Sequence, residues 1–180
     1  ECITKSVRVI LKNQTLVKKV IFPVEILPVI ICISSLLHLF ISLNILLIAY
    51  AVLVAPPPIQ TFYIPLLIAI CFPMLLSLSW LIAALGTLSR DIEQITGLLA
   101  RGILFISPVL YRFENPPYIL DALITINPIS LIVEQMRTII FNHSAPDFSA
   151  LAIYFVLSLI SSCLAYLFFM SMRKHFADLI

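Results

Sequence analysis

The feature that most constrains this chain is a run of sixty-four residues, from Ile26 to Ser89, without a single Asp, Glu, Lys or Arg. One bilayer crossing needs about 20 apolar residues, so the run is long enough for two crossings. Three consecutive prolines at positions 56–58 divide it, and they cannot continue a helix because they lack the backbone N–H. The sequence therefore predicts one membrane-spanning helix over residues 26–55 and a returning one over residues 59–89.

Two further segments are long and apolar. Residues 94–112 are uncharged apart from Arg101 and their last residue, Arg112, and residues 148–172 carry no charge. The whole chain is 62% hydrophobic and only 11% charged, against about 25% charged residues in soluble domains. Pro65 and Pro73 predict kinks in the second crossing. The predicted fold class is an all-α integral membrane protein, a polytopic helical bundle with four transmembrane helices in a single domain.

Arg101 is the one charge inside the third predicted crossing. A charged side chain at the bilayer centre costs about 2.5–3.5 kcal/mol, so such residues need a partner or water. Glu93 lies two turns earlier on the same helix face, and a long arginine side chain can reach toward it along the helix. We expect an Arg101 side chain directed at Glu93, with a polar transport pathway as the alternative.

Residues 113–147 are too many for a structureless loop and contain two helix starts. Pro116 and Pro117 begin the first, and Asn127, as an N-cap before Pro128, begins a second that ends near Asn142. The second helix should bury one stripe formed by Ile129, Ile132, Val133, Met136, Ile139 and Ile140, and expose Ser130, Glu134, Arg137 and Thr138. Pieces of about ten and fifteen residues cannot span about 30 Å of hydrocarbon, which predicts an external re-entrant helical hairpin.

The positive charges lie mostly on one predicted side. Nine of the eleven Lys and Arg residues fall in residues 1–25, at the 89–101 turn or in the 173–180 tail. Positively charged loops stay in the cytoplasm, so these segments are expected there. The chain opens on Glu1 with no methionine and with a helical pattern already under way, which suggests a piece of a longer protein.

Candidate catalytic and metal-binding residues are scarce. The four cysteines have no metal-ligand spacing, no disulfide is expected, and no phosphate-binding loop or hydrolase motif occurs. His38 is the only histidine within a predicted crossing, and we expect it to hydrogen-bond a neighbouring helix rather than act as a base. Polar residues such as Asn44, Ser77 and Ser161 are expected to bond across helices. The chain should bind no cofactor and no nucleic acid, and ATP, if it powers transport, must be hydrolysed elsewhere.

Aromatic residues are spread over the crossings and their far-side ends. Most of them are typical of an aromatic belt and a packed core. A minority could line a pathway and stack on sugar rings, which present an apolar face. The candidates for such a lining are Tyr50, Phe62, Trp80, Phe105, Tyr111 and Tyr118.

Four local patterns carry a family resemblance. They are LVKKVIFPVEILP at 16–28, SRDIEQI at 89–95, SPVLY at 107–111 and INPISLIVEQMR at 126–137. Their order and separations are similar to those of ABC-2 type transporter permeases, in the branch that exports O-antigen, capsule or teichoic acid polysaccharide, and the likeness covers residues 1–180. The resemblance implies a six-helix permease, of which this chain holds the last four helices.

The resemblance also implies roles for particular residues. The segment 13–22 corresponds to the coupling helix that fits a cleft on an ATPase subunit, and 113–147 to short helices that cap the channel. Relatives usually have a basic residue where Val24 stands, and Glu25 needs a partner such as Lys18, Lys19 or an ATPase residue. The implied ATPase-coupling residues are Leu16, Lys18, Lys19, Phe22, Pro23 and Glu25. The implied residues of a cytoplasmic gate or loop are Arg90, Asp91 and Glu93. The implied residues of the external re-entrant helices are Pro117, Asn127, Pro128, Glu134 and Arg137.

The function implied is that of a non-enzymatic permease subunit in an ATP-driven exporter of a lipid-linked polysaccharide across the bacterial inner membrane. Its expected partners are an ABC ATPase carrying ATP and Mg²⁺, a second permease copy, the lipid-linked polysaccharide and membrane lipids. An ABC-2 exporter of a drug or small lipid is the alternative in the same class. An intramembrane transferase would need clustered acidic or histidine residues, which this sequence does not have, and a non-transporting scaffold subunit is a third alternative.

Overall fold

All regular structure in the described part of the chain is helical. The computed structural model describes residues 1–179 except positions 14, 16–22, 55, 90 and 108–126. The helices are α1 (Cys2–Ser6), α2 (Val9–Lys12), α4 (Ile26–Leu53), the 3-10 helix η1 (Ile59–Tyr63), α5 (Ile64–Leu88), α6 (Ile92–Ile106), α8 (Pro128–Phe141) and α9 (Phe148–Leu179).

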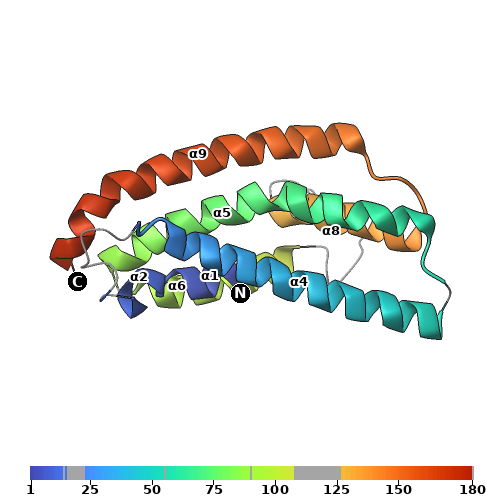
Figure 1. Cartoon of the computed structure of the whole chain (residues 1–180), viewed down its shortest axis with the longest axis horizontal. Coiled ribbons are helices and arrows are strands. Elements are labelled where there is room, and N and C mark those ends of the chain that lie inside the picture. The colour runs from blue at the N-terminus through green and yellow to red at the C-terminus, as the bar shows by residue number, and fades with distance from the viewer. Residues whose placement is uncertain (14, 16–22, 55, 90, 108–126, 180) are drawn as a thin grey trace.

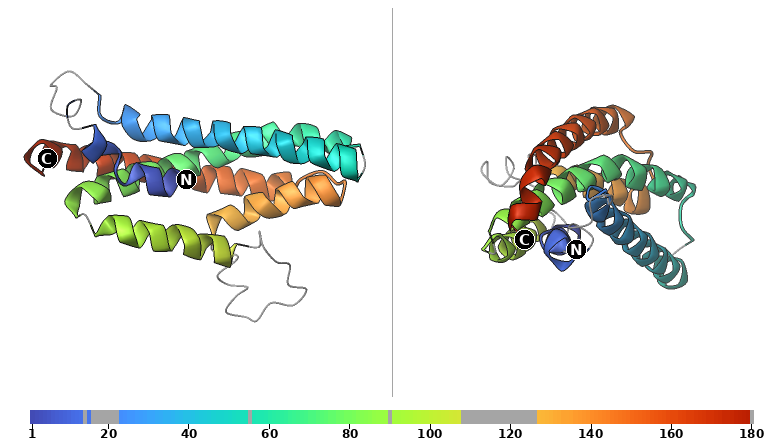
Figure 2. Two further views of the ribbon diagram at one scale, coloured as in Figure 1. Left: turned by 90° about the horizontal axis from the view of Figure 1, so that it is seen from below. Right: turned by 60° about the vertical axis from the view of Figure 1, so that its left-hand side comes forward.

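The long helices run along one axis of an elongated bundle (Figure 1). α4 leads away from one end, and α5 returns antiparallel to it after residues 54–63. α9 runs back beside α5, and this pair forms the most extensive helix contact. Figure 2 shows α1, α2 and α6 on a further side of the bundle, toward the end where α5 finishes. α5 is therefore the central helix, and it contacts each of the other described helices.

Three described helices are long and apolar enough to cross a membrane: Ile26–Leu53, Ile59–Leu88 and Phe148–Arg173. They agree with the predicted crossings at 26–55, 59–89 and 148–172. α6 has 15 residues and reaches only about 22 Å, and residues 108–112 of its predicted crossing lie outside the described residues. The third predicted crossing, at 94–112, therefore stays a prediction.

The two prolines of the returning segment differ in their positions. α5 begins at Ile64, so Pro65 occupies its first turn, where a missing N–H costs nothing and no kink is needed. The prediction of a kink at Pro65 was wrong because the preceding residues form the separate η1. Pro73 lies inside α5, as predicted, and leaves the carbonyl of Ala69 without its helical partner.

Two apolar clusters hold the bundle together. The first joins α2, the start of α4, α5 and α9, and contains Val9, Ile10, Val24, Leu27, Ala83, Ala84, Phe169 and Phe176. The second joins α5, α8 and α9, and contains Ile64, Leu67, Cys71, Ile132, Ile139, Ile140 and Leu151. α8 is thus packed against the long helices through its predicted apolar stripe.

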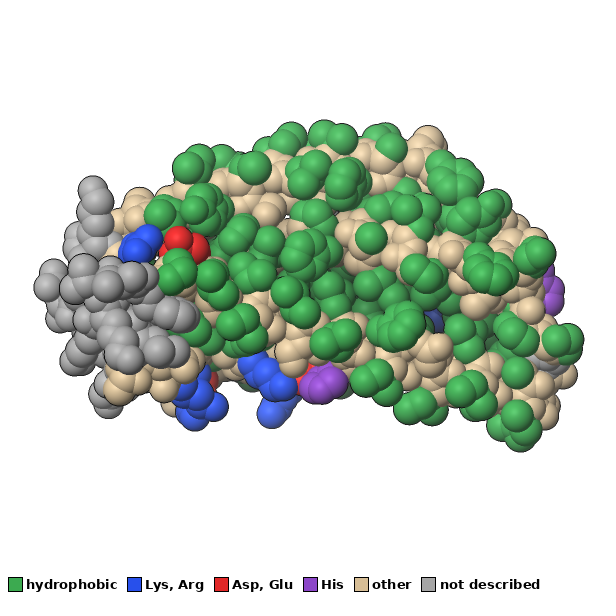
Figure 3. All heavy atoms as spheres, in the orientation of Figure 1, with side chains coloured by type: hydrophobic (Ala, Val, Ile, Leu, Met, Phe, Trp, Pro, Cys, Tyr) green, Lys and Arg blue, Asp and Glu red, His purple; other side chains and the backbone are tan. Residues whose placement is uncertain are grey.

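The outer surface is dominated by exposed aliphatic and aromatic side chains. Figure 3 shows hydrophobic side chains over most of the visible face, with charged groups toward one end and along one edge. Leu37 and Ile45 on α4 and Leu157 and Leu167 on α9 each expose more than half of their surface. Contiguous apolar surface of this extent marks contact with lipid or another apolar partner, which agrees with a multi-pass membrane protein.

The N-terminal segment packs against the bundle. α1 contacts α5, where Cys2 Sγ is 2.8 Å from Ser79 Oγ. The placement of residues 1–25 on the cytoplasmic side stays a prediction. Glu1 also contacts His38, twelve residues along α4. Val7, Val9 and Ile10 are buried because their apolar face meets the long helices.

Candidate functional site at the charged end

The charged end of the bundle is the end that holds Arg8, Lys12, Glu25, Glu93 and Arg173. Of the predicted coupling residues, Leu16, Lys18, Lys19 and Phe22 lie outside the described residues. Pro23 is described and leads into α4, directly before Val24 and Glu25. Val24 is 4% exposed and belongs to the apolar cluster at this end, so a basic side chain there would have no water around it.

Glu25 pairs with the end of α9. Its Oε2 is 3.3 Å from Arg173 Nη1, and its backbone carbonyl accepts a hydrogen bond of 3.1 Å from Trp80 Nε1 of α5. Sequence reasoning named Lys18, Lys19 or an ATPase residue as partners and missed Arg173, which is far away in sequence. The signal was present, because Arg173 is the first charge after the apolar run of α9 and lies on the predicted side. Glu25 therefore joins α4, α5 and α9 at their common end.

Glu93 pairs with Arg8 rather than with Arg101. Its Oε1 contacts Arg8 Nη2, which brings the segment between α1 and α2 onto the first turn of α6. The predicted Glu93–Arg101 contact along α6 was wrong, because α1 packs beside α6 and offers a nearer guanidinium. Arg101 stays exposed. The Arg8–Glu93 ion pair thus crosses between helices.

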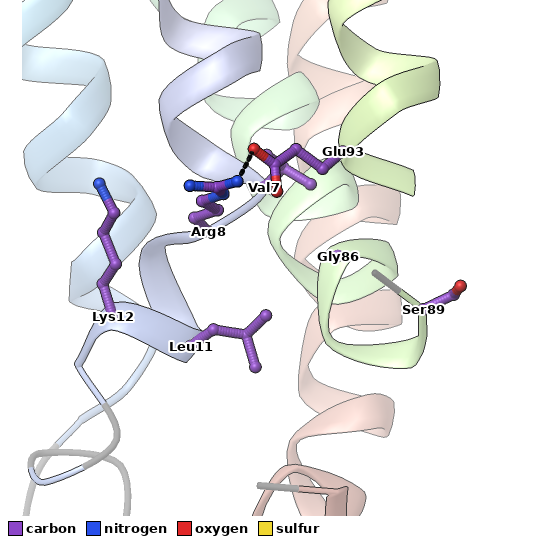
Figure 4. Close-up of a pocket in the computed structure, with 7 residues that line it drawn as sticks. All are labelled: Val7, Arg8, Leu11, Lys12, Gly86, Ser89 and Glu93. Atoms are coloured by element: carbon purple, nitrogen blue, oxygen red, sulfur yellow. Dashed lines mark ion pairs between the residues drawn. The ribbon is translucent and has the colours of Figure 1, made fainter. Parts of the chain in front are cut away.

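A pocket of about 340 Å³ opens beside this ion pair. Figure 4 shows Arg8 and Glu93 on one side and Leu11, Lys12 and Ser89 around the rest. Val7 and Gly86 complete the lining. The pocket combines two cations, one anion and an apolar wall, which suits an amphiphilic or anionic group.

Gly86 is a functional candidate that sequence reasoning missed. A Cβ built on it would lie 2.2 Å from the carbonyl oxygen of Val7, so only glycine allows α5 to approach α1 this closely. The sequence signal was the single glycine near the end of the second crossing. By contrast, Gly97 and Gly102 on α6 have nothing within 4 Å of such a Cβ.

The predicted gate residues lie around the start of α6. Arg90 is outside the described residues. The backbone N–H of Asp91 donates to Ser89 Oγ at 3.2 Å, and Asp91 is the residue before the first helical turn. Glu93 lies in that turn, where a carboxylate is favoured by the helix dipole. Asp91 and Glu93 are thus next to the pocket, as parts of the α5–α6 connection.

The predicted helix start at Asn127 is confirmed. α8 begins near the middle of the bundle and runs toward the end opposite the charged end, called here the far end (Figure 2). Asn127 Oδ1 accepts from the Ile129 N–H at 3.0 Å, and Pro128 is the first helical residue of α8. Asn127 Nδ2 also lies 3.5 Å from the Ile103 carbonyl oxygen of α6, to which it donates. Pro117 and the first predicted short helix lie outside the described residues, so the hairpin stays a prediction.

The two faces of α8 differ in part from those predicted. Glu134 and Arg137 were both predicted to lie on the face away from the core. Glu134 is exposed and Arg137 is half-buried. Ser130 was placed on the exposed face but is only 4% exposed. This prediction was wrong because α8 packs on α5 and its first turn, which contains Ser130, lies beside α6, where Asn127 donates to the Ile103 carbonyl oxygen.

The candidate lining aromatics fall into separate groups. Tyr50 meets Phe141 edge to face at 6.1 Å between ring centroids, at the far end. Trp80 packs against Tyr166 at 5.0 Å, near Glu25. Phe62 and Phe105 expose 84% and 63% of their surfaces. Tyr111 and Tyr118 lie outside the described residues. The described aromatics thus do not converge on one site, and a sugar-stacking role stays a prediction.

Polar residues inside the crossings bond between and within helices. Ser77 Oγ lies 2.9 Å from Ser161 Oγ, which joins α5 to α9 as predicted. His38 Nδ1 lies 2.9 Å from Glu1 Oε1, so it contacts another segment as expected. Asn44 instead donates to the Phe40 carbonyl of its own helix at 2.7 Å. All four cysteines are free, and no three described His, Cys, Asp or Glu side chains gather as metal ligands.

Comparison with known proteins agrees with this geometry. Residues 2–141 match the ABC-2 type transporter family. The O-antigen export system permease protein RfbA of Myxococcus xanthus is 25% identical over 168 residues, which cover 92% of this chain and 65% of that protein. Its namesake in Klebsiella pneumoniae is 20% identical over 178 residues, which cover 98% of this chain and 68% of that protein.

This chain spans about two thirds of the length of these two relatives. The family match, in contrast, extends over most of the chain and includes α1, α4, α5, α6 and α8. It covers the pocket, both residues of the Arg8–Glu93 pair and the Asn127 cap. The chain therefore belongs to the ABC-2 type transporter family.

Proposed function

We propose that the whole protein is the membrane-spanning permease subunit of an ATP-driven exporter of a lipid-linked polysaccharide. The observation that carries this proposal is the match of residues 2–141 to the ABC-2 type transporter family, together with two relatives whose names describe O-antigen export. Three apolar helices with largely exposed surfaces fit a membrane subunit. ATP and Mg²⁺ would be bound by a separate ATPase subunit.

The coupling segment 13–22 would contact this ATPase on the cytoplasmic side. Its last residues lead through Pro23 to Glu25, which joins α4, α5 and α9 through the Arg173 ion pair and the Trp80 hydrogen bond. A push on the segment would therefore move three long helices together as a rigid body. Two permease copies would form the complete path.

The proposed orientation puts the charged end in the cytoplasm of a bacterium and the far end outside the inner membrane. It is supported by the excess of Lys and Arg in the segments at the charged end. α8, which is about 21 Å long and packed on η1 and α5, would belong to the external hairpin that caps the channel.

Reconstitution of the full-length permease with its ATPase in proteoliposomes tests this function. Charge reversal by Lys18→Glu and Lys19→Glu should abolish assembly and ATP-dependent glycan transport, whereas Lys18→Arg and Lys19→Arg should retain both. Unchanged transport after charge reversal would refute the docking role. If the intact complex moves a drug or a small lipid but no glycan, the polysaccharide assignment is wrong.

A further inference from the structure

One face of α1 and α2 carries a continuous stripe of polar side chains. The opposite face is buried and includes Cys2, Val9 and Ile10. The exposed residues recur every three or four positions, which places them on a single side of the helical segment. This polar stripe consists of Glu1, Thr4, Lys5, Arg8 and Lys12.

The polar stripe runs from the charged end deep into the bundle. Arg8 and Lys12 line the pocket at the charged end. Glu1 reaches His38, which is twelve residues beyond Ile26 and thus about 18 Å along α4. The contact with α5 gives an independent measure of how far the polar stripe extends into the bundle. Cys2 contacts Ser79, which lies about 14 Å before the end of α5 at Leu88.

The inner end of the stripe lies within the predicted hydrocarbon layer. α4 is about 42 Å long, whereas the hydrocarbon core is about 30 Å thick. Even if all the excess length protruded at the charged end, His38 would lie about 6 Å inside the core.

Three ionisable groups meet at this inner end. Glu1 pairs with Lys5, and His38 Nδ1 lies 2.9 and 3.1 Å from the two carboxylate oxygens of Glu1. The side chains of Lys5, Glu1 and His38 remain 51%, 38% and 56% exposed, so the described part of the chain does not cover them. Figure 3 shows Lys, Arg and His side chains along this edge of an otherwise apolar face.

Exposure of such groups to lipid tails is strongly unfavourable, and ionisable residues at this depth face a water-filled cavity or the protein interior. We propose that the polar stripe and His38 line a water-filled path from the charged end into the membrane, along which the hydrophilic head group of an exported amphiphile moves. This inference rests on the proposed export function. It adds the residues that would form the path on this chain.

The chemistry of the stripe indicates what kind of head group it would accept. Lys5, Arg8 and Lys12 are donors with positive charge, whereas Glu1 accepts hydrogen bonds, as does Glu93 of α6 beside the stripe. This mixture suits a group that carries both hydroxyls and phosphate. The pocket between Arg8, Lys12 and Glu93 is large enough, at about 340 Å³, to hold a first sugar or phosphate unit.

Thiol labelling of the full-length permease in complex with its ATPase tests the inference. His38→Cys and Leu37→Cys are made in a protein whose native cysteines are replaced by alanine, and sulfonatoethyl methanethiosulfonate is the anionic, membrane-impermeant probe. The two positions are adjacent and equally deep, but point about 100° apart around α4. Leu37 is 58% exposed on the apolar side and serves as the matched control. Lys5→Cys replaces His38→Cys if the latter does not assemble.

His38→Cys should react at least about tenfold faster than Leu37→Cys, because only a hydrated thiol forms the reactive thiolate. Its modification should also block glycan export. If His38→Cys reacts as slowly as Leu37→Cys, lipid or protein covers the stripe and the proposal is overturned. The same holds for Lys5→Cys if that variant replaces His38→Cys. Fast labelling without any effect on export would exclude the cargo path. Fast labelling in a complex that exports no glycan even before labelling would instead refute the proposed function.

Discussion

Gly86 of α5 lies directly against the backbone of Val7, at the point where the N-terminal segment meets the central helix. A Cβ on Gly86 would be 2.2 Å from the Val7 carbonyl oxygen and 2.8 Å from Val7 Cγ2. A backbone atom cannot move away by a change of rotamer. The contact therefore sets how close α1 can lie to α5, and with it the shape of the pocket beside Arg8.

Gly86→Ala should separate α1 from α5 and lower the stability of the full-length protein by about 1–3 kcal/mol, the usual cost of overpacking. Thermal unfolding in detergent measures this loss. Gly97→Ala is the matched control, because a Cβ there meets nothing within 4 Å and alanine favours the helix by about 0.5–1 kcal/mol. Equal stability of the two variants would contradict the close approach.

The Glu25–Arg173 ion pair should appear as a coupling energy in a double-mutant cycle. Glu25→Gln, Arg173→Gln and the double variant are compared by chemical unfolding in detergent at low and high salt. The pair is partly exposed, at 24% and 36% of the side-chain surface, so we expect a coupling of about 0.2–1 kcal/mol. Additive effects of the two single changes would show that the pair does not join α4 to α9.

Trp80→Phe should lose the hydrogen bond to the Glu25 carbonyl while retaining an aromatic ring against Tyr166. The expected loss of stability is about 0.5–1.5 kcal/mol, which circular dichroism during thermal unfolding can measure. Tyr166→Phe retains the ring contact and serves as the control, with little change expected. If the two variants unfold alike, the indole N–H does not contribute.

Asn127→Ala should weaken the first turn of α8 by about 1 kcal/mol, because the Ile129 N–H loses its acceptor. Hydrogen exchange at the amides of residues 129–133 in the full-length protein measures the effect locally. Asn127→Asp retains a capping oxygen and should restore slow exchange, although it loses the donor to Ile103. Fast exchange in both variants would assign the main role to the link with α6.

Asp147 should make the start of α9 sensitive to acid. The Ser149 hydroxyl and then the N–H groups of Ala150 and Ser149 hold the pKa of the Asp147 carboxyl below its ordinary value of 3.8. Because the folded-state pKa is lowered, this contribution is present above 3.8 and is lost as the pH falls through the folded-state pKa. Hydrogen exchange at Ser149 and Ala150 should rise over that range relative to neighbouring amides. Asp147→Asn should remove this pH dependence, and a persistent dependence would implicate another group.

The long-range contacts were the part of the site that sequence reasoning could not supply. The sequence placed Glu25 and Arg173 on the same side but did not pair them, because the 147 intervening residues include several long helices whose lateral packing is not encoded locally. It paired Glu93 with Arg101 along one helix, since local spacing was the only geometry available. Ser130 was assigned to the wrong face for the same reason, because the first turn of α8 lies beside α6, a neighbour that the helical period of α8 alone cannot indicate.

The sequence by itself determined the membrane class, the three long apolar helices, the break at Pro56–Pro58 and the cap at Asn127. These features follow from local composition, backbone chemistry and helical periodicity, which act within a few turns. Only the tertiary structure decided that α1 lies against Gly86, that Arg8 meets Glu93 and that the polar stripe reaches His38. These relations depend on which helix faces touch, and nearly uniform apolar helices allow many lateral arrangements until close packing and ion pairing select one.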